Sequence, residues 1–168
     1  MPLRLRPFNE DDGTRAIALH DDLEGEFEFL LGWDEVTAWD VFVRHQSDTH
    51  FGRNLVSDRV RAMLLAADLE GELVGRVSIR FALNEFLFER GGHIGYVVRR
   101  DYRRRGLATE MLRQALVVAR AEGVGRVLMI CDDENVGSAT VIERCGGRLE
   151  RVVPASSGDV AYRRYWID

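Results

Sequence analysis

The sequence predicts one α/β (α+β) domain with a mixed central β-sheet and about four flanking helices. Strand-like and helix-like segments alternate over residues 1–168, the length of an ordinary single domain. An amphipathic helix predicted over Leu107–Ala121 is followed by a continuous apolar run over Arg126–Cys131, which is typical of a buried strand. This alternation predicts helices packed in layers on a sheet.

The N-terminal part is predicted to form a strand and two helices. Leu3–Phe8 alternates apolar and polar residues, which indicates a short strand. Asn9 is a suitable N-cap for a helix that runs to about Asp22, because acidic residues occupy its first turn. Helical spacing predicts a second helix over Asp34–Gln46, and a polar loop is expected over Ser47–Val56.

Three strands are expected in the middle of the chain. Met63–Asp68 and Leu73–Leu83 are strand-like runs joined by a Glu-Gly-Glu turn, which predicts a hairpin. Gly91–Val98 is expected to form the next strand. The loop Asn84–Gly92 carries a Phe-Leu-Phe run, residues 86–88, which could line an acceptor pocket, a dimer face or a small satellite core.

The C-terminal part alternates between helices and strands. Gly123 is expected to end the helix over Leu107–Ala121. A further helix is predicted over Asn135–Arg144, and two last strands over Arg148–Val153 and Ala161–Ile167.

Composition excludes several classes of protein. A formal net charge of -5 and a pI near 5.4 argue against a general nucleic-acid binder. No apolar run approaches the roughly 18 residues of a membrane span, and the N-terminus has no signal core, so a cytoplasmic protein is expected. Cys131 and Cys145 have no CxxC spacing, so neither a disulfide nor a metal site is predicted.

An arginine-rich segment lies between the predicted strand Gly91–Val98 and the helix that follows. Its arginines are Arg99, Arg100, Arg103, Arg104 and Arg105. Gly106 allows close backbone approach, and the small Ala108 leaves room beside it. The first amides of a helix have no internal partner and lie at the positive end of its dipole, so the segment predicts an anion site suited to a pyrophosphate. The chain has neither a P-loop nor a G-x-G-x-x-G motif.

The sequence Arg-Arg-Arg-Gly-Leu-Ala at Arg103–Ala108 resembles the [Q/R]-x-x-G-x-[G/A] signature of the GNAT superfamily of N-acetyltransferases. The segment "NVGSATVIERCGG" at Asn135–Gly147 resembles the family's next helix, and the intervening elements follow the family's order. The likeness covers at least Leu73–Glu150 and extends to a bacterial subgroup that carries "GGHIGY" and "RRYWID". It implies a sheet that splays after its fourth strand, Ile94–Val98.

The resemblance also implies a set of residues that hold acetyl-CoA. Backbone groups of Val97 and Val98 are expected to pair with the pantetheine arm, and Asn135 and Ser138 to face the far wall of the cofactor site. The pyrophosphate is expected on the loop that opens the helix, with side-chain contacts from its arginines. The loop residues are Arg103, Arg104, Arg105, Gly106, Leu107, Ala108 and Thr109.

The implied reaction is direct attack of an amine on the thioester. A lysine-like amine is neutral in only about one of 10³ molecules at pH 7, so a side chain or water must take its proton. The candidate bases are His93, Glu85 and Asp132, with Asp133 beside Asp132. A strand histidine bonded to a neighbour and a helix-capping aspartate are the structural alternatives.

A proton donor for the departing thiolate is harder to identify. Many relatives place a tyrosine on the second cofactor-side helix, but the aligned residue here is Ile142. The alternatives are Tyr96, Tyr162 and Tyr165, or unaided departure, which a thiol pKa near 8.5 allows.

The acceptor is expected to be a small-molecule amine. The segment Asn9–Asp40 contains eleven acidic residues and one arginine, and the resemblance places it beside the acceptor site. Three of its carboxylates lie among aromatic residues, which favours a cationic amine, whereas a solvated acidic face is the alternative. These carboxylates are Glu24, Glu26 and Glu28. For an acceptor with a carboxylate, Arg80 or Arg163 is the expected contact instead.

The main hypothesis is therefore an acetyl-CoA-dependent N-acetyltransferase. A non-catalytic acyl-CoA-binding sensor on the same fold is the alternative, favoured if the candidate bases lie far from the thioester. A homodimer is left open, and no nucleic-acid or membrane partner is expected.

Overall fold

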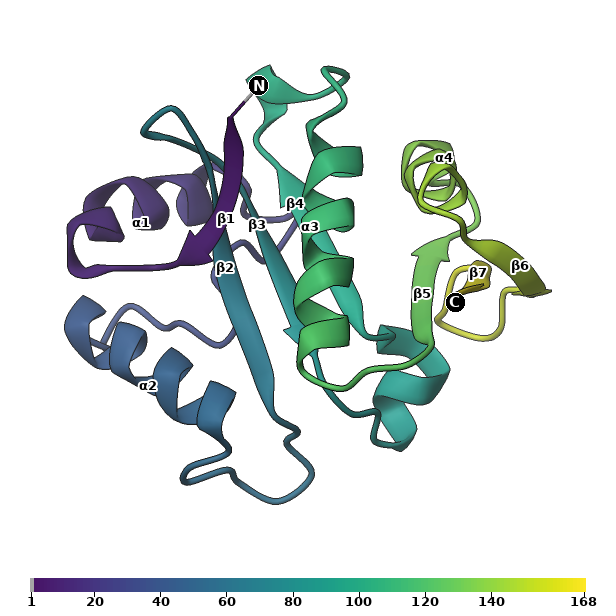
Figure 1. The fold of residues 1–168 in the computed structure, drawn as a ribbon, viewed down its shortest axis with the longest axis horizontal. Coiled ribbons are helices and arrows are strands. Elements are labelled where there is room, and N and C mark those ends of the chain that lie inside the picture. Colours follow the sequence, from purple (N-terminus) through teal and green to yellow (C-terminus); the bar gives the residue numbers. More distant parts are fainter. Residues whose placement is uncertain (1) are drawn as a thin grey trace.

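Residues 2–168 are described by a computed structural model, in which they form seven strands in two sheets and four α-helices (Figure 1). The strands are β1 (Leu3–Pro7), β2 (Ala62–Leu69), β3 (Glu72–Arg80), β4 (Ile94–Val98), β5 (Val127–Asp132), β6 (Arg148–Val153) and β7 (Tyr162–Ile167). The helices are α1 (Gly13–Asp22), α2 (Trp39–Phe51), α3 (Leu107–Ala121) and α4 (Val136–Arg144). Shorter helical turns span Glu10–Asp12, Leu87–Gly91 and Arg100–Tyr102.

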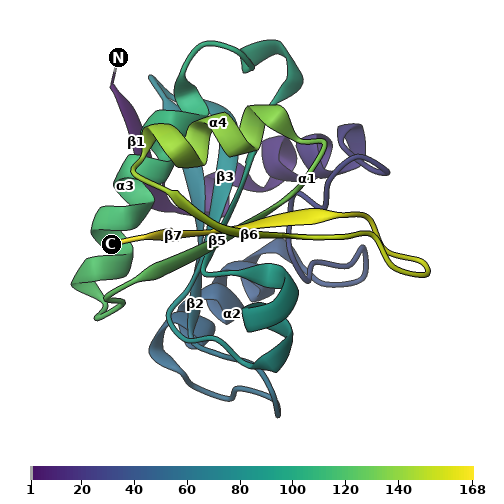
Figure 2. The ribbon, with the colours of Figure 1, turned by 90° about the vertical axis from the view of Figure 1, so that its right-hand side faces the viewer.

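The two sheets separate between β4 and β5. One sheet has the antiparallel order β1-β2-β3-β4, and the other has the antiparallel order β5-β7-β6. Figure 2 shows the second sheet running across the front of the first. The predicted splay after the fourth strand is therefore confirmed, as is the number of flanking helices.

Both faces of the four-stranded sheet are covered by helices (Figure 1). α1 and α2 cover one face, where Phe8, Phe29 and Phe42 belong to the buried core. α3 covers the other face, and its apolar stripe, which includes Met111 and Leu112, packs on β1, β3 and β4. The boundaries predicted for α3 from its periodicity are confirmed.

The second helix begins and ends later in the chain than the sequence predicts. The expectation of a helix over Asp34–Gln46 was wrong at both ends, because α2 runs from Trp39 to Phe51 and includes part of the expected loop. The Asp34 carboxylate accepts hydrogen bonds from the N–H and the hydroxyl of Thr37 (2.7 and 2.6 Å), which stabilises a turn instead of a helix. Val36, whose spacing indicated a helix, is 93% exposed.

The strand before the arginine-rich segment is shorter than expected. β4 begins at Ile94 instead of Gly91, because Leu87–Gly91 forms a π-helical turn. That turn is held to β7 by Arg164, which donates to the carbonyl of Phe88 and lies over its ring at 4.9 Å. The loop is therefore an ordered support for the junction between the sheets.

The junction itself is made by His93 and Leu128. The His93 N–H donates to the Leu128 carbonyl (2.8 Å), and the Leu128 N–H donates to Nδ1 of His93 (2.8 Å). Gly92 allows this approach, since a Cβ on it would lie 2.7 Å from the Leu128 carbonyl oxygen. His93 is 7% exposed, and burial, together with the nearby Arg80 cation, lowers its pKa.

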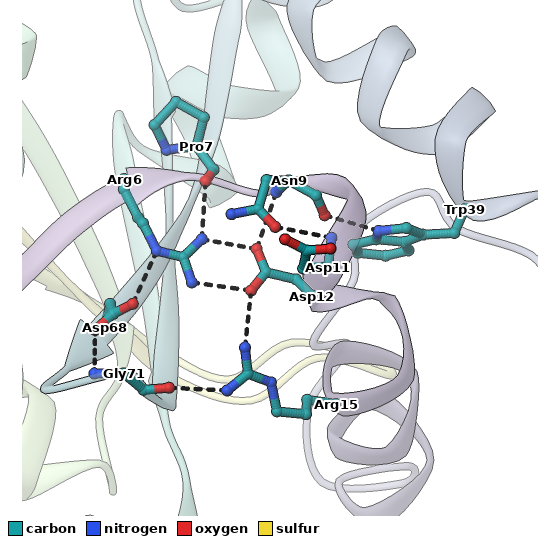
Figure 3. Close-up of polar contacts among 9 residues, drawn as sticks. All are labelled: Arg6, Pro7, Asn9, Asp11, Asp12, Arg15, Trp39, Asp68 and Gly71. Atoms are coloured by element: carbon teal, nitrogen blue, oxygen red, sulfur yellow. Dashed lines mark hydrogen bonds and ion pairs between the residues drawn. The ribbon is translucent and has the colours of Figure 1, made fainter.

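A second polar cluster ties β1 and β2 to the start of α1 (Figure 3). Arg6 donates to both carboxylate oxygens of Asp12 (2.7 and 2.9 Å) and to Asp68 (2.9 Å). Asp12 is fully buried and also accepts the N–H of Asn9 (2.9 Å), which completes the cap predicted from the sequence. Burial alone would raise the pKa of Asp12, but the bonds from Arg6 and Asn9 outweigh it and lower the pKa.

Arg6→Met tests this cluster. The substitution leaves the Asp12 carboxylate buried without its cation, so the free energy of unfolding should fall by roughly 3 kcal/mol. Denaturant unfolding at pH 7 measures the change, and Arg59→Met, at an exposed arginine without an ion pair within residues 2–168, is the control. A loss no larger than that of the control would contradict a structural role for this ion pair.

His93→Asn tests the junction through its pH dependence. Because the pKa of His93 is lowered on folding, only the unfolded chain takes up its proton as the pH falls below the unfolded value of 6.5. Between pH 7.5 and 5.5 the wild-type chain should therefore lose about 1 kcal/mol more stability than the variant. Asparagine offers an acceptor oxygen and no titrating group, so parallel pH dependence in both proteins would show that His93 is not held neutral.

Candidate active site

Above the His93–Leu128 junction, β4 and β5 face each other without backbone hydrogen bonds between them within the described chain. Arg99 donates to the Val74 carbonyl and Arg80 to that of His93 at the two ends of the β3–β4 ladder. Hydrogen-bonded pairs alternate in an antiparallel ladder, so odd-numbered residues of β4 bond to β3 and even-numbered ones face the gap. Tyr96 and Val98 therefore direct their backbone groups into the gap.

The same alternation of hydrogen-bonded residues argues against Val97, one of the two residues whose backbone was predicted to pair with the pantetheine arm. Val97 lies opposite Arg76 in a hydrogen-bonded pair, so its N–H and C=O are used within the sheet. Val98 does face the gap, but its carbonyl already accepts a hydrogen bond from Arg103 Nε (3.0 Å). On the other wall, the Asp133 N–H donates to the Ala161 carbonyl, so the odd-numbered residues of β5 form the hydrogen-bonded pairs with β7. The backbone of the even-numbered Ile130 therefore faces the gap.

The loop at the end of β4 presents a row of free amides. The N–H groups of residues 104–109 make no hydrogen bond within the described chain, and the first helical bond runs from Glu110 to Gly106. Arg104 (φ 62°) and Gly106 (φ 78°) are both left-handed, which is typical of a backbone nest that binds anions. Leu107 and Thr109 bury their side chains, so they offer only their amides here.

The five arginines of this segment have different partners. Arg99 pairs with Asp101 (2.8 Å), and Arg100 pairs with Glu26 (2.8 Å). Arg104 and Arg105 have no carboxylate within 4.0 Å among residues 2–168, and both are exposed. These two side chains are therefore free to meet an anion on the amides.

Arg103 points back into the protein. Its Nη1 lies 2.6 Å from Glu26, its Nε binds the Val98 carbonyl, and its guanidinium lies 5.6 Å from the ring of Phe27. Its Nη2 is buried with no hydrogen-bond partner among the described residues. Arg103 thus joins the end of β4 to the segment between α1 and α2, which is a different role from the predicted phosphate contact.

A hydroxyl pair bridges β4 and α4 beside the gap. Tyr96 Oη and Ser138 Oγ lie 2.8 Å apart, and burial, partly offset by this bond, raises the pKa of Tyr96 to about 12. Cys131 lies near both, and burial raises its pKa to about 11, so its thiol stays protonated. The position of the missing family tyrosine, Ile142, is buried in the core.

The two other candidate tyrosines are differently placed. Tyr165 is fully buried and donates to Glu143 (3.0 Å). Tyr162 lies opposite Asp132 on β7, and Arg90 covers its ring at 4.5 Å. Tyr96 is therefore the tyrosine that lies on a wall of the gap.

The three candidate bases are not brought together. His93 is at the closed end of the gap, and its Nδ1 is used by Leu128. Asp132 ends β5 at the open end, four residues or about 13 Å of strand from Leu128, and its side chain is exposed. Glu85 is exposed in the loop before the Leu87–Gly91 turn, beyond the closed end. Asp133 forms an ion pair with Arg163 (2.6 Å).

Asn135 and Ser138 lie at the start of α4. The Asn135 side chain accepts the N–H of Ser138 (3.0 Å), which is the helix-capping role. Ser138 reaches the gap through its bond to Tyr96, and its contact with the cofactor stays a prediction.

The acidic segment before α2 is mostly engaged. Glu26 binds Arg100 and Arg103, and Glu28 accepts the N–H of Gly32 (3.0 Å). Together with Glu24 they line a shallow hollow beside Phe27, which lies next to the arginine loop. The structure therefore gives Glu26 two arginine partners and Glu28 a backbone amide within the chain, which the sequence did not reveal.

The described residues contain neither a helix that could span a membrane nor a cluster that could hold a metal ion. No helix among residues 2–168 is long and apolar enough to cross a membrane. No group of three or more His, Cys, Asp or Glu side chains in that part of the chain is arranged to hold a metal ion.

Comparisons with known proteins agree with this arrangement. None of the curated proteins matches the sequence. Solved structures match in fold: yncA from Salmonella typhimurium with its cofactor acetyl-CoA has a TM-score of 0.69 at 11% identity, covering 100% of this chain and 94% of that one. The microcin C7 self-immunity acetyltransferase MccE, in complex with acetyl-CoA and AMP, has a TM-score of 0.66 at 17% identity, covering 98% and 91%.

A third structure is RimL, the ribosomal L7/L12 alpha-N-protein acetyltransferase in complex with coenzyme A, with a TM-score of 0.68 at 21% identity over 98% of this chain and 92% of that one. The family model described as acetyltransferase (GNAT) domain matches residues 2–148. With the splayed sheets and the free amides at the head of α3, this match shows that the chain belongs to the GNAT acetyltransferase family.

Proposed function

We propose that this protein transfers the acetyl group of acetyl-CoA to a primary amine of a small molecule. The observation that carries the proposal is the gap between β4 and β5, with unpaired backbone groups on both walls and six free amides at its open end. An extended, amide-containing arm suits the walls, and a pyrophosphate suits the amides. Related folds solved with acetyl-CoA or CoA support the choice of ligand.

The binding groups follow from the geometry. The N–H of Val98, the backbone of Tyr96 and that of Ile130 are available to pair with the arm. The amides of residues 104–109 would hold the pyrophosphate, and Arg104 and Arg105 would neutralise it. When bound, acetyl-CoA supplies a thioester whose carbonyl carbon an amine can attack.

Tyr96 is proposed as the proton donor to the leaving thiolate. The amine nitrogen forms a bond to the acetyl carbon and gives its proton to the base, the carbon–sulfur bond breaks, and the sulfur takes a proton from Tyr96 Oη, which then regains a proton from water. A pKa of about 12 keeps Tyr96 protonated at neutral pH, and Ser138 orients its hydroxyl. Tyr96 thereby takes the part that family relatives assign to the position of Ile142.

The base that deprotonates the amine is proposed to be Asp132, acting through water, instead of His93. In the tautomer that accepts at Nδ1, the Nε2 of His93 carries a hydrogen and has no lone pair to offer. Asp132 is exposed at the open end of the gap and is free of ion pairs within residues 2–168. Glu85 stays the third candidate, and Asp132→Asn against Glu85→Gln separates the two carboxylates.

A non-catalytic acyl-CoA sensor is the competing function. Such a protein would bind acetyl-CoA through the same loop but would release no CoA with any amine. The likeness to RimL raises a protein N-terminus as a further type of acceptor, so the panel of amines should include peptides as well as small molecules.

Gly106→Val tests the ligand assignment. The side chain would stand over the free amides, so affinity for acetyl-CoA should fall at least tenfold, or about 1.4 kcal/mol. Isothermal calorimetry measures the affinity. Gly123→Val is the matched control, because Gly123 also has a positive φ (92°) and no atom near its Cβ position, but lies at the far end of α3. Equal affinity in the two variants would overturn the pyrophosphate site.

Tyr96→Phe tests the proton donor. The variant should lose roughly 10² in kcat at pH 7 and keep its affinity for acetyl-CoA, since only the hydroxyl is removed. CoA release measures the rate, and Tyr165→Phe, which loses a hydroxyl bonded to Glu143, is the control. A full rate in Tyr96→Phe would mean that the thiolate leaves without this donor.

A further inference from the structure

Two arginines, the buried Arg76 and the half-buried Arg80, lie side by side on the α1–α2 face of β3. Arg76 is 7% exposed and donates from Nε to the Phe29 carbonyl (3.0 Å) and from Nη2 to the Glu28 carbonyl (2.6 Å). Arg80 donates from Nη1 to Ser78 Oγ (2.6 Å) and from Nη2 to the Gly91 carbonyl (2.9 Å). Every one of these acceptors is neutral.

Neither cation has a carboxylate within 4.0 Å in the part of the chain that the structure describes. The other well-buried arginine, Arg164, has Glu150 at 2.7 Å, and Arg6 has Asp12 at 2.7 Å. Burial and the nearby Arg80 lower the pKa of Arg76 to about 10, against a smaller opposite effect of the Glu28 carboxylate, and burial alone lowers that of Arg80 to about 10. Two unpaired cations in one buried place are unfavourable unless an anion joins them.

Both guanidinium groups retain free donors. Nε of Arg80 is buried and has no acceptor, and Nη1 of Arg76 makes no hydrogen bond with any described residue. The two groups meet at Gly95 on β4. A Cβ at Gly95 would lie 3.4 Å from Nη1 of Arg80, 3.8 Å from Nη1 of Arg76 and 3.3 Å from Ser78 Oγ. Without a side chain on Gly95, the three polar groups surround a position that a single Cβ would occupy in close contact.

This space adjoins the gap on the side away from α3. Side chains alternate along a strand, so Gly95 and Tyr96 face opposite sides of β4. Tyr96 packs towards α3 and α4, where the free amides lie, whereas Gly95 faces the α1–α2 segment. A molecule bound at Gly95 would therefore reach the gap from the side opposite to the amide row.

We propose that Arg76 and Arg80 bind an oxyanion, a carboxylate or a phosphate, carried by the amine acceptor. The inference rests on the proposed acetyl transfer and names its substrate class. Two guanidinium groups with free donors suit an oxyanion, and Ser78 adds a hydroxyl. It is an alternative to the cationic acceptor expected from the sequence, because Arg100 and Arg103 neutralise Glu26, one of the three carboxylates behind that expectation. Arg80 is the contact expected from the sequence for an acceptor with a carboxylate.

A panel of matched amines tests the charge of the acceptor. The panel pairs amino acids with their amides, and phosphoethanolamine with ethanolamine, and adds putrescine as a dication. The anionic member of at least one pair should have a kcat/KM at least tenfold higher than its neutral partner, and the better pair distinguishes carboxylate from phosphate. Preference for putrescine or for the neutral members would overturn the proposal.

Two variants locate the effect. Arg80→Gln should raise KM for the anionic amine at least tenfold and leave KM for acetyl-CoA unchanged. Gly95→Ala keeps both arginines but fills the space between them, so it should also raise KM for the anionic amine. Arg148→Gln, an arginine whose side chain is 84% exposed, is the control. An unchanged KM in Gly95→Ala, provided that it folds, would place the acceptor elsewhere.

A direct titration separates this proposal from the acetyl-transfer proposal. The Nε–H resonance of Arg80, assigned by its loss in Arg80→Gln, should shift when acetate or inorganic phosphate is added, and Gly95→Ala should reduce that shift. A shift in a protein that fails to bind acetyl-CoA would sink only the transferase. No shift in a protein that acetylates amines would sink only the oxyanion site.

Discussion

The single junction between β4 and β5 is the constraint on which the rest of the structure depends. His93 and Leu128 exchange the last two hydrogen bonds between the sheets, and Gly92 allows the backbones to meet there. Beyond that point the strands separate, so backbone groups that a continuous sheet would have paired face a gap. Because unpaired N–H and C=O groups are costly when buried, they need water or a ligand. The family's site is therefore a consequence of where pairing stops.

The arginines near the gap differ in whether a carboxylate neutralises them. The acidic segment between α1 and α2 supplies Glu26, which neutralises Arg100 and Arg103. Arg104 and Arg105 are exposed in the loop of free amides, and Arg105 lies over the ring of Tyr102 at 4.9 Å. Arg76 and Arg80 on the other side of the sheet lack such a partner. The molecule thus presents positive charge on both sides of the gap despite its net negative charge.

Local patterns predicted the elements that are stabilised locally. The amphipathic period of α3 and the apolar run of β5 gave correct boundaries to within one or two residues, because one buried face determines α3 and burial of both faces determines β5. The prediction for α2 was wrong because a turn at Asp34 competes with the helical spacing of Val36. A short side chain that bonds its own backbone can override periodicity, and the sequence shows both signals at once.

What the sequence by itself determined is the row of free amides at the head of α3 and the family to which the chain belongs. Free amides at a helix N-terminus are a local property, so Gly106 and its neighbours were sufficient to identify them. Tertiary structure decided which groups face the gap. Strand register turns the backbone groups of Val97 towards β3 and those of Val98 towards the gap. It also allows the hydrogen bonds of His93 with Leu128 and of Tyr96 with Ser138. It also placed Arg76 beside Arg80 at Gly95, because partners across a sheet depend on pairing between distant segments, which residue order alone does not encode.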